Sequence, residues 1–76
     1  MADVVVYTMT GCPHCAALKE FLKENGVSYL ERDVAASDEA LAEFRKLGFR
    51  GTPATVVGDR SVVGFDKEKV AELLGI

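Results

Sequence analysis

The sequence predicts an α/β domain with the element order β-α-β-α-β-β-α, in which three helices cover a mixed four-stranded sheet. Short runs of β-branched residues alternate with amphipathic helical stretches, and two of these runs flank a Gly-Asp turn. The length of 76 residues leaves room for one domain only. We therefore expect a single domain over residues 1–76, with a parallel, right-handed first β-α-β unit and an antiparallel closing hairpin.

The first half of the chain predicts two strands and a helix. Val4 to Tyr7 is a continuous β-branched and aromatic run, which is typical of a central strand with helices on both sheet faces. A helix is expected from Pro13, which suits a first helical position, to Glu24, and it ends at Asn25-Gly26. Val27 to Asp33 predicts the second strand. Its expected core-facing residues are Val27, Tyr29 and Leu30.

The second half predicts two more helices and a hairpin. Ser37 is a good N-cap, and acidic residues follow it where the helix dipole favours them. This helix is expected to run to Leu47, before Gly48. Its apolar face would consist of Leu41, Phe44 and Leu47. The last elements are expected to be the strands Ala54–Val57 and Arg60–Val63 and the helix Lys67–Leu74, which Asp66 caps.

Composition and charge exclude several classes of function. The net charge is -3, and the basic residues are scattered, which disfavours nucleic acid as a partner. No apolar run approaches the ~18 residues of a membrane span. Asp3 interrupts what would be the basic start of a signal peptide. We therefore expect a monomeric cytoplasmic protein that binds no membrane.

The sequence Cys12-Pro13-His14-Cys15 contains both cysteines of the chain. A bridge across so short a loop adds little stability and does not persist in a reducing cytosol, so the pair is chemical rather than structural. Cys12 precedes a helix whose free N–H groups stabilise a thiolate, whereas Cys15 lies one turn further in. We expect Cys12 to attack a disulfide and Cys15 to resolve the mixed disulfide.

The two residues between the cysteines have separate expected roles. Pro13 stiffens the turn. His14 adds a polar, sometimes positive group that would stabilise the Cys12 thiolate and make the couple more oxidising. The alternative for His14 is a merely solvated residue at a helix start. A zinc site is disfavoured, because a structural site takes four ligands and the chain has no further Cys or His.

The step Thr52-Pro53 precedes the third expected strand. A proline at the first residue of a strand is tolerated in the ordinary trans form, and most X–Pro bonds are trans. A cis bond at this position would instead indicate a specific structural role, because cis X–Pro bonds are uncommon in folded proteins.

Taken together, the CPxC motif, the Thr-Pro step and Gly64-Phe65-Asp66 before the last helix resemble the glutaredoxins of the thioredoxin superfamily, in a short bacterial or archaeal type. The resemblance covers essentially the whole chain. It implies the thioredoxin-like glutaredoxin fold and a dithiol–disulfide oxidoreductase acting in cell redox homeostasis. It also implies a cis Pro53 that packs against the cysteines.

The resemblance further implies glutathione as a co-substrate, with no bound cofactor and no metal. The Thr52 backbone would pair with the tripeptide along Thr52-Pro53. Its γ-glutamyl end would lie near Gly64, Phe65 and Asp66. Arg50 matches a basic residue that glutaredoxins place near the glycine carboxylate, although it could also be a solvated loop charge.

Departures from the glutaredoxin pattern keep other functions open. Met9 stands where many members have a lysine, Thr52 where many have valine, and Phe65 where most have a small residue. Gly-Phe is typical of the short NrdH-type redoxins, which take electrons from thioredoxin reductase and donate them to ribonucleotide reductase. An iron–sulfur carrier, in which two chains share a cluster, is a third class. The Pro13 turn and the second cysteine disfavour it.

Overall fold

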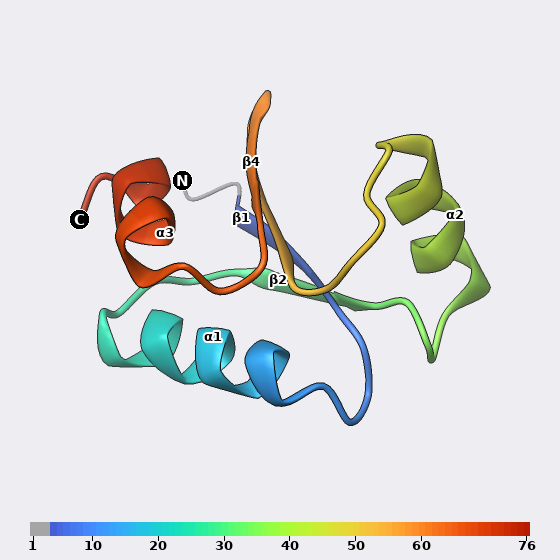
Figure 1. Cartoon of the computed structure of the whole chain (residues 1–76), viewed down its shortest axis with the longest axis horizontal. Helices are drawn as coiled ribbons and strands as arrows, with labels where there is room; N and C mark the ends of the chain where they lie inside the picture. Colours follow the sequence, from blue (N-terminus) through green and yellow to red (C-terminus); the bar gives the residue numbers. More distant parts are fainter. Residues whose placement is uncertain (1–3) are drawn as a thin grey trace.

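The computed structural model describes residues 4–76 and contains the expected elements in the expected order (Figure 1). They are β1 (Val4–Thr8), α1 (Pro13–Glu24), β2 (Leu30–Asp33), α2 (Asp38–Lys46), β3 (Ala54–Val57), β4 (Arg60–Val63) and α3 (Lys67–Leu74). The predicted fold class is confirmed. Residues 1–3, on which the expectation of no signal peptide rests, lie outside the described residues.

The strand order places the loop after β1 beside the start of β3. The sheet has the order β2-β1-β3-β4. β1 pairs with β2 in parallel and β3 pairs with β4 in antiparallel orientation, as the sequence predicts, and β1 also pairs with β3 in antiparallel orientation. Tyr7 near the end of β1 lies opposite Ala54 at the start of β3. Consequently the residues that follow β1 and those that precede β3 meet at one end of the sheet.

Helices cover both faces of the sheet, with α1 and α3 on one face and α2 on the other (Figure 1). The core on the first face contains Val4, Val6, Leu18, Leu22 and Val70. The core on the second face contains Tyr7, Val34, Ala40, Phe44 and Ala54. This division follows from the strand alternation, because Val6 and Tyr7 point to opposite faces. Within residues 4–76, no helix is long and apolar enough to cross a membrane.

The second strand is shorter than predicted. Its ladder with β1 begins at the pair Val5–Leu30, so β2 starts at Leu30 rather than Val27. Val27 and Tyr29 still pack against the α1 face. Leu30 is 58% exposed, which contradicts its predicted core position. The reason is that β2 is an edge strand of the sheet, and the hydrogen bonds between α2 and β2 are made by Arg32.

The end of α2 also differs from the prediction. The helix ends at Lys46, and Leu47 is its C-cap with 54% of its surface exposed. Gly48 takes a positive φ of 85°, which reverses the chain direction. Phe49 then folds back so that its ring lies 5.7 Å from that of Phe44. Phe49 therefore fills the apolar position that the helical pattern assigned to Leu47.

Candidate active site

Cys12 occupies the N-cap of α1, where helix geometry leaves backbone donors free. Its φ and ψ of -89° and 113° are extended, and Pro13 follows at the first helical position. Gly11 has a positive φ of 82°, and the Cys12 amide donates to the Met9 carbonyl at 3.1 Å. This tight turn sets the Cys12 sulfur at the end of the helix, where an anion is stabilised.

The two cysteines have opposite environments. Cys12 is half-buried, whereas Cys15 is 2% exposed, and both are free thiols. Hydrogen bonds from the Cys15 thiol and then from its amide lower the pKa of Cys12, and smaller contributions come from the Thr52 hydroxyl and the His14 amide. Burial raises the pKa of Cys15, and so does its hydrogen bond with Cys12. The pair therefore combines an accessible, acidic thiol with a buried, weakly acidic one.

Thr52, which precedes Pro53, lies against Cys12. The Thr52–Pro53 peptide bond is cis, as the resemblance implies, and Pro53 is fully buried. The Thr52 hydroxyl donates to the Cys12 sulfur at 3.8 Å, and the Cys12 thiol lies 4.0 Å from the Thr52 carbonyl. Thr52 therefore approaches the Cys12 sulfur with both its hydroxyl and its carbonyl group.

The residues between β4 and α3 reach the same loop through one backbone contact. The Gly64 amide donates to the Pro53 carbonyl at 2.7 Å, and Gly64 has a positive φ of 86°. Phe65 turns inward, and its ring lies 5.8 Å from that of Phe21. Asp66 caps α3 by accepting from the Lys69 amide at 3.3 Å, which confirms its predicted capping role.

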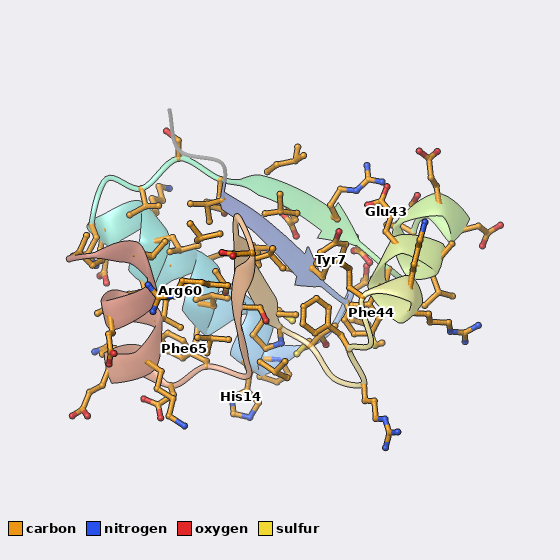
Figure 2. All side chains as sticks on the ribbon, turned by 90° about the horizontal axis from the view of Figure 1, so that it is seen from above. Tyr7, His14, Glu43, Phe44, Arg60 and Phe65 are labelled. Carbon is orange, nitrogen blue, oxygen red and sulfur yellow. The ribbon has the colours of Figure 1, made fainter. Side chains whose placement is uncertain are left out.

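Two predicted site residues lie apart from these contacts. His14 is exposed, and its ring projects away from the body of the protein (Figure 2). The group of His14 that lowers the pKa of Cys12 is its backbone amide, through a hydrogen bond. Arg50 is exposed on the loop before Thr52. The structure thus brings together Cys12, Cys15 and Thr52, whereas the side chains of His14 and Arg50 are exposed on the surface.

A cavity beside the cysteines contains residues that sequence reasoning missed. Its volume is about 410 Å³, and its walls come from residues 9–11, the first turns of α1, and Glu31 and Asp33 of β2. Lys19 also lines it, one helical turn after Cys15. The sequence carried one signal: the predicted second strand ends in three consecutive charged residues, Glu31, Arg32 and Asp33. We call this space the cysteine cavity.

Hydrogen bonds fix the charged groups of the cysteine cavity. Glu31 Oε2 accepts from the buried Thr8 hydroxyl at 2.8 Å and from Lys19 Nζ at 3.0 Å, which lowers the pKa of Glu31. Asp33 Oδ2 accepts from the Thr10 hydroxyl at 2.6 Å, and this contact, together with backbone N–H groups, lowers the pKa of Asp33. Both carboxylates therefore stay ionised near neutral pH. Among residues 4–76, no three His, Cys, Asp or Glu side chains are placed to hold a metal ion.

Known proteins are similar to this chain over most of its length. A family model described as Glutaredoxin matches residues 4–62. A glutaredoxin of Neisseria meningitidis serogroup B is 40% identical over 67 residues, which are 86% of this chain and 79% of that protein. The structure of a mutant of the thioredoxin-like protein BC3987 has a TM-score of 0.92 at 38% identity, covering 100% of this chain and 99% of that one.

A third similar protein is the glutaredoxin-like NrdH-redoxin from Escherichia coli. Its structure has a TM-score of 0.83 at 30% identity and covers 93% of each chain. The similarity therefore extends to both glutaredoxins and NrdH-type proteins. Since the family model matches well over half of the residues, the chain belongs to the glutaredoxin family of thiol–disulfide oxidoreductases.

Proposed function

We propose that this protein is a dithiol–disulfide oxidoreductase that reduces protein disulfides and glutathione mixed disulfides through Cys12 and Cys15. The observation that carries the proposal is the asymmetry of the pair. Cys12 is half-buried at a helix N-terminus with a lowered pKa, whereas Cys15 is buried with a raised pKa. An accessible thiolate suits attack, and a protected thiol suits a second step that follows only after a mixed disulfide has formed.

The reaction proceeds in two balanced exchanges. The Cys12 thiolate attacks one sulfur of the substrate disulfide, the S–S bond breaks, and the other sulfur leaves as a thiolate that takes up a proton. Cys15 then loses its proton and attacks Cys12 Sγ, which releases the second substrate thiol. Two electrons have passed to the substrate, and the protein holds a Cys12–Cys15 disulfide.

Thr52 and Pro53 are proposed to hold the substrate in register. The Thr52 backbone lies beside Cys12, with its carbonyl oxygen 4.0 Å from the Cys12 sulfur. An extended segment next to the attacked disulfide can pair with this backbone as a short antiparallel strand. Because Pro53 has no N–H, it offers no competing donor beside the sulfurs.

We propose glutathione as the electron donor, in a cytoplasmic setting where it is available as a reductant. Asp66 is exposed at the N-terminus of α3 and uses Oδ1 for its cap, so Oδ2 can receive an α-ammonium group. Free N–H groups of the same helix terminus suit the adjacent carboxylate. Arg50 is exposed on the loop before Thr52 and can pair with the carboxylate at the other end.

The second candidate donor is thioredoxin reductase, which would make the protein an NrdH-type redoxin for ribonucleotide reductase. Met9, at 47% exposed, lines the cysteine cavity where many glutaredoxins have a lysine. The 30% identity to the NrdH-redoxin from Escherichia coli supports this candidate as well. Both candidates use the same dithiol chemistry and differ in the protein or peptide that regenerates it.

One coupled assay separates the donors. Reduction of a small neutral disulfide is followed through NADPH consumption, with either glutathione plus glutathione reductase or thioredoxin reductase alone. Turnover with glutathione supports the first proposal. No turnover with glutathione, together with rapid reduction by thioredoxin reductase, replaces it with the second candidate. No turnover with either contradicts the proposed donors together.

A variant pair tests the two charged glutathione contacts. Asp66→Asn keeps a capping residue while removing charge, and it is combined with Arg50→Gln. A hydrogen bond to a charged group contributes about 1.5–3 kcal/mol, and every 1.4 kcal/mol or about that changes affinity tenfold. The apparent KM for glutathione should therefore rise more than tenfold. The matched control is Asp59→Asn with Arg60→Gln at the far end of the hairpin, which should leave KM unchanged. Equal changes in both pairs would contradict the assigned contacts.

A further inference from the structure

The cysteine cavity joins Cys12 to a charged wall on β2. Cys12, Pro13 and Ala16 lie at its end nearest the proposed point of attack, and Glu31 and Asp33 belong to the neighbouring strand. Its volume of about 410 Å³ lies in the range of about 300–1,000 Å³ that small-molecule sites occupy. A side chain flanking a disulfide that Cys12 attacks would have this space beside it.

The charge of this wall is negative. Glu31 and Asp33 each contribute one negative charge. Lys19 contributes one positive charge and forms a salt bridge with Oε2 of Glu31. The Asp33 oxygens accept from neutral donors, the Thr10 hydroxyl and two backbone amides, which fix the carboxylate without neutralising it. The three side chains thus sum to one negative charge, to which the Cys12 thiolate adds another.

Apart from Thr10 and the two cysteines, the remaining lining of the cavity carries no polar side chain. Met9, Pro13 and Ala16 form a methylene-rich surface next to Cys12, and Met9 is 47% exposed. Lysine and arginine side chains bury apolar stems while their charged ends reach polar groups. A basic side chain therefore matches both parts of the cavity, whereas an acidic one would meet two fixed carboxylates.

We propose that the cysteine cavity is a specificity subsite for a lysine or arginine that flanks the attacked cysteine in a disulfide-containing protein substrate. The carboxylates of Glu31 and Asp33 bind the charged end of this lysine or arginine. Lys19 reduces the net negative charge of the site. The inference rests on the proposed function, because it concerns the substrate of the same Cys12 exchange. It predicts that charge complementarity at this cavity selects among protein disulfides.

The test uses three peptides that differ only beside one cysteine, which carries a 2-hydroxyethyl disulfide. The flanking residues are lysine, glutamine or glutamate. Single-turnover exchange with the reduced protein gives a second-order rate constant for each peptide. The lysine peptide should react about fivefold faster than the glutamine peptide at low salt and the glutamate peptide slower, and high salt should shrink this ratio.

Variants of opposite sign separate charge from structural damage. Glu31→Gln and Asp33→Asn should each lower the lysine-to-glutamine rate ratio at least twofold. Lys19→Gln should raise that ratio, which loss of structure would not do. The matched controls are Glu24→Gln, Asp59→Asn and Lys23→Gln, which change net charge equally but lie outside the cavity lining.

Each outcome decides one of the two proposals. A ratio near one in the unmutated protein, with exchange intact, overturns the subsite and leaves the dithiol function standing. Equal shifts in cavity variants and controls also overturn the subsite, since net charge would then explain the selection. Absence of exchange with all three peptides contradicts the proposed function itself.

Discussion

The two faces of the sheet carry similar polar groups that serve different ends. Successive residues of β1 and β2 point to opposite faces, so Thr8 and Glu31 lie on the α1 face, while Tyr7 and Arg32 lie on the α2 face. On each face a hydroxyl and a cation meet a carboxylate. On the α1 face that carboxylate is Glu31, and it opens onto the cysteine cavity.

On the α2 face the carboxylate belongs to Glu43, and an aromatic cluster packs beside the network. The Tyr7 hydroxyl donates to Glu43 at 3.3 Å, and Arg32 donates two hydrogen bonds to it at 3.2 and 2.7 Å. Figure 2 shows Tyr7, Glu43 and Phe44 gathered at α2. Burial raises the pKa of Tyr7, and the charge of Glu43 adds to this rise.

The difference lies in what fills the space beside each network. Aromatic rings occupy it on the α2 face, where the Tyr7 and Phe44 centroids are 5.8 Å apart. On the α1 face a cavity remains next to Cys12 and Cys15. We infer that the hydrogen bonds of the α2 network hold the helix against the sheet. The α1 network instead holds the charged side chain of Glu31 in place beside the reacting cysteines. Changes on the two faces should therefore have separable effects.

The largest expected effect comes from removing the thiols beside the cavity. Cys12→Ser should abolish all disulfide exchange, because the attacking sulfur is lost. Cys15→Ser should retain reduction of glutathione mixed disulfides, which needs one thiol, and lose dithiol reduction of protein disulfides. Alkylation of the native reduced protein followed by mass spectrometry should label Cys12 first. Faster labelling of Cys15 would reverse the assigned roles.

The next effect is on the α2 face and concerns stability. Phe44→Ala removes a buried ring and should lower the free energy of unfolding by about 3–5 kcal/mol, measured by urea denaturation. The rate of Cys12 alkylation in the folded fraction should not change. Leu47→Ala is the control: Leu47 is exposed, and its loss should cost within about 0.5 kcal/mol. A large decrease in the free energy of unfolding for Leu47→Ala would instead indicate that Leu47 packs in the core.

Local patterns sufficed to predict the fold and the cysteine pair. Pro13, Asn25-Gly26 and Asp66 are local signals, and the helices they bound agree with the structure. Leu30 and Leu47 were assigned wrongly because their exposure depends on which elements lie opposite, which periodicity does not contain. The cysteine cavity was missed for the same reason, since it arises only where β1, α1 and β2 meet.

A smaller effect distinguishes two buried threonines on the α1 face. The Thr55 hydroxyl is fully buried and has no hydrogen-bond partner within the described residues, whereas the Thr8 hydroxyl donates to Glu31. Thr55→Val should raise the free energy of unfolding by about 1 kcal/mol, because an unsatisfied polar group is removed. Thr8→Val should lower it by about 1 kcal/mol. Calorimetric unfolding of both variants measures the contrast, and a destabilised Thr55→Val would contradict it.

The effect of His14 on the reduction potential should be smaller still. A positive or donating group near Cys12 stabilises the thiolate, so replacing His14 with tyrosine should lower the potential. Because the ring is exposed and projects away, we expect a fall below about 20 mV, which is less than about 1 kcal/mol because about 30 mV corresponds to about 1.4 kcal/mol for two electrons. Equilibration with glutathione buffers measures it. A fall of twice that size would show that the ring reaches Cys12.

The smallest effect is the acid sensitivity that the α1 network gives the fold. Hydrogen bonds from Thr8 and then Lys19 lower the pKa of Glu31, so Glu31 contributes stability above its unfolded pKa of about 4.3. That contribution should be lost as pH falls through the lowered folded-state pKa. The stability difference between the unmutated protein and Glu31→Gln should therefore shrink between about pH 5 and pH 2.

The same network allows a direct check on the cause. Thr8→Val removes the largest of the interactions that lower the pKa of Glu31, so the Glu31 carboxyl should titrate at higher pH in this variant. A carbon-detected NMR titration of that carboxyl measures the change. Arg32→Gln, which alters the α2 network instead, is the matched control and should leave the Glu31 titration in place. If both variants move it equally, the two faces are electrostatically coupled through the sheet, and their roles are not separable in the way proposed.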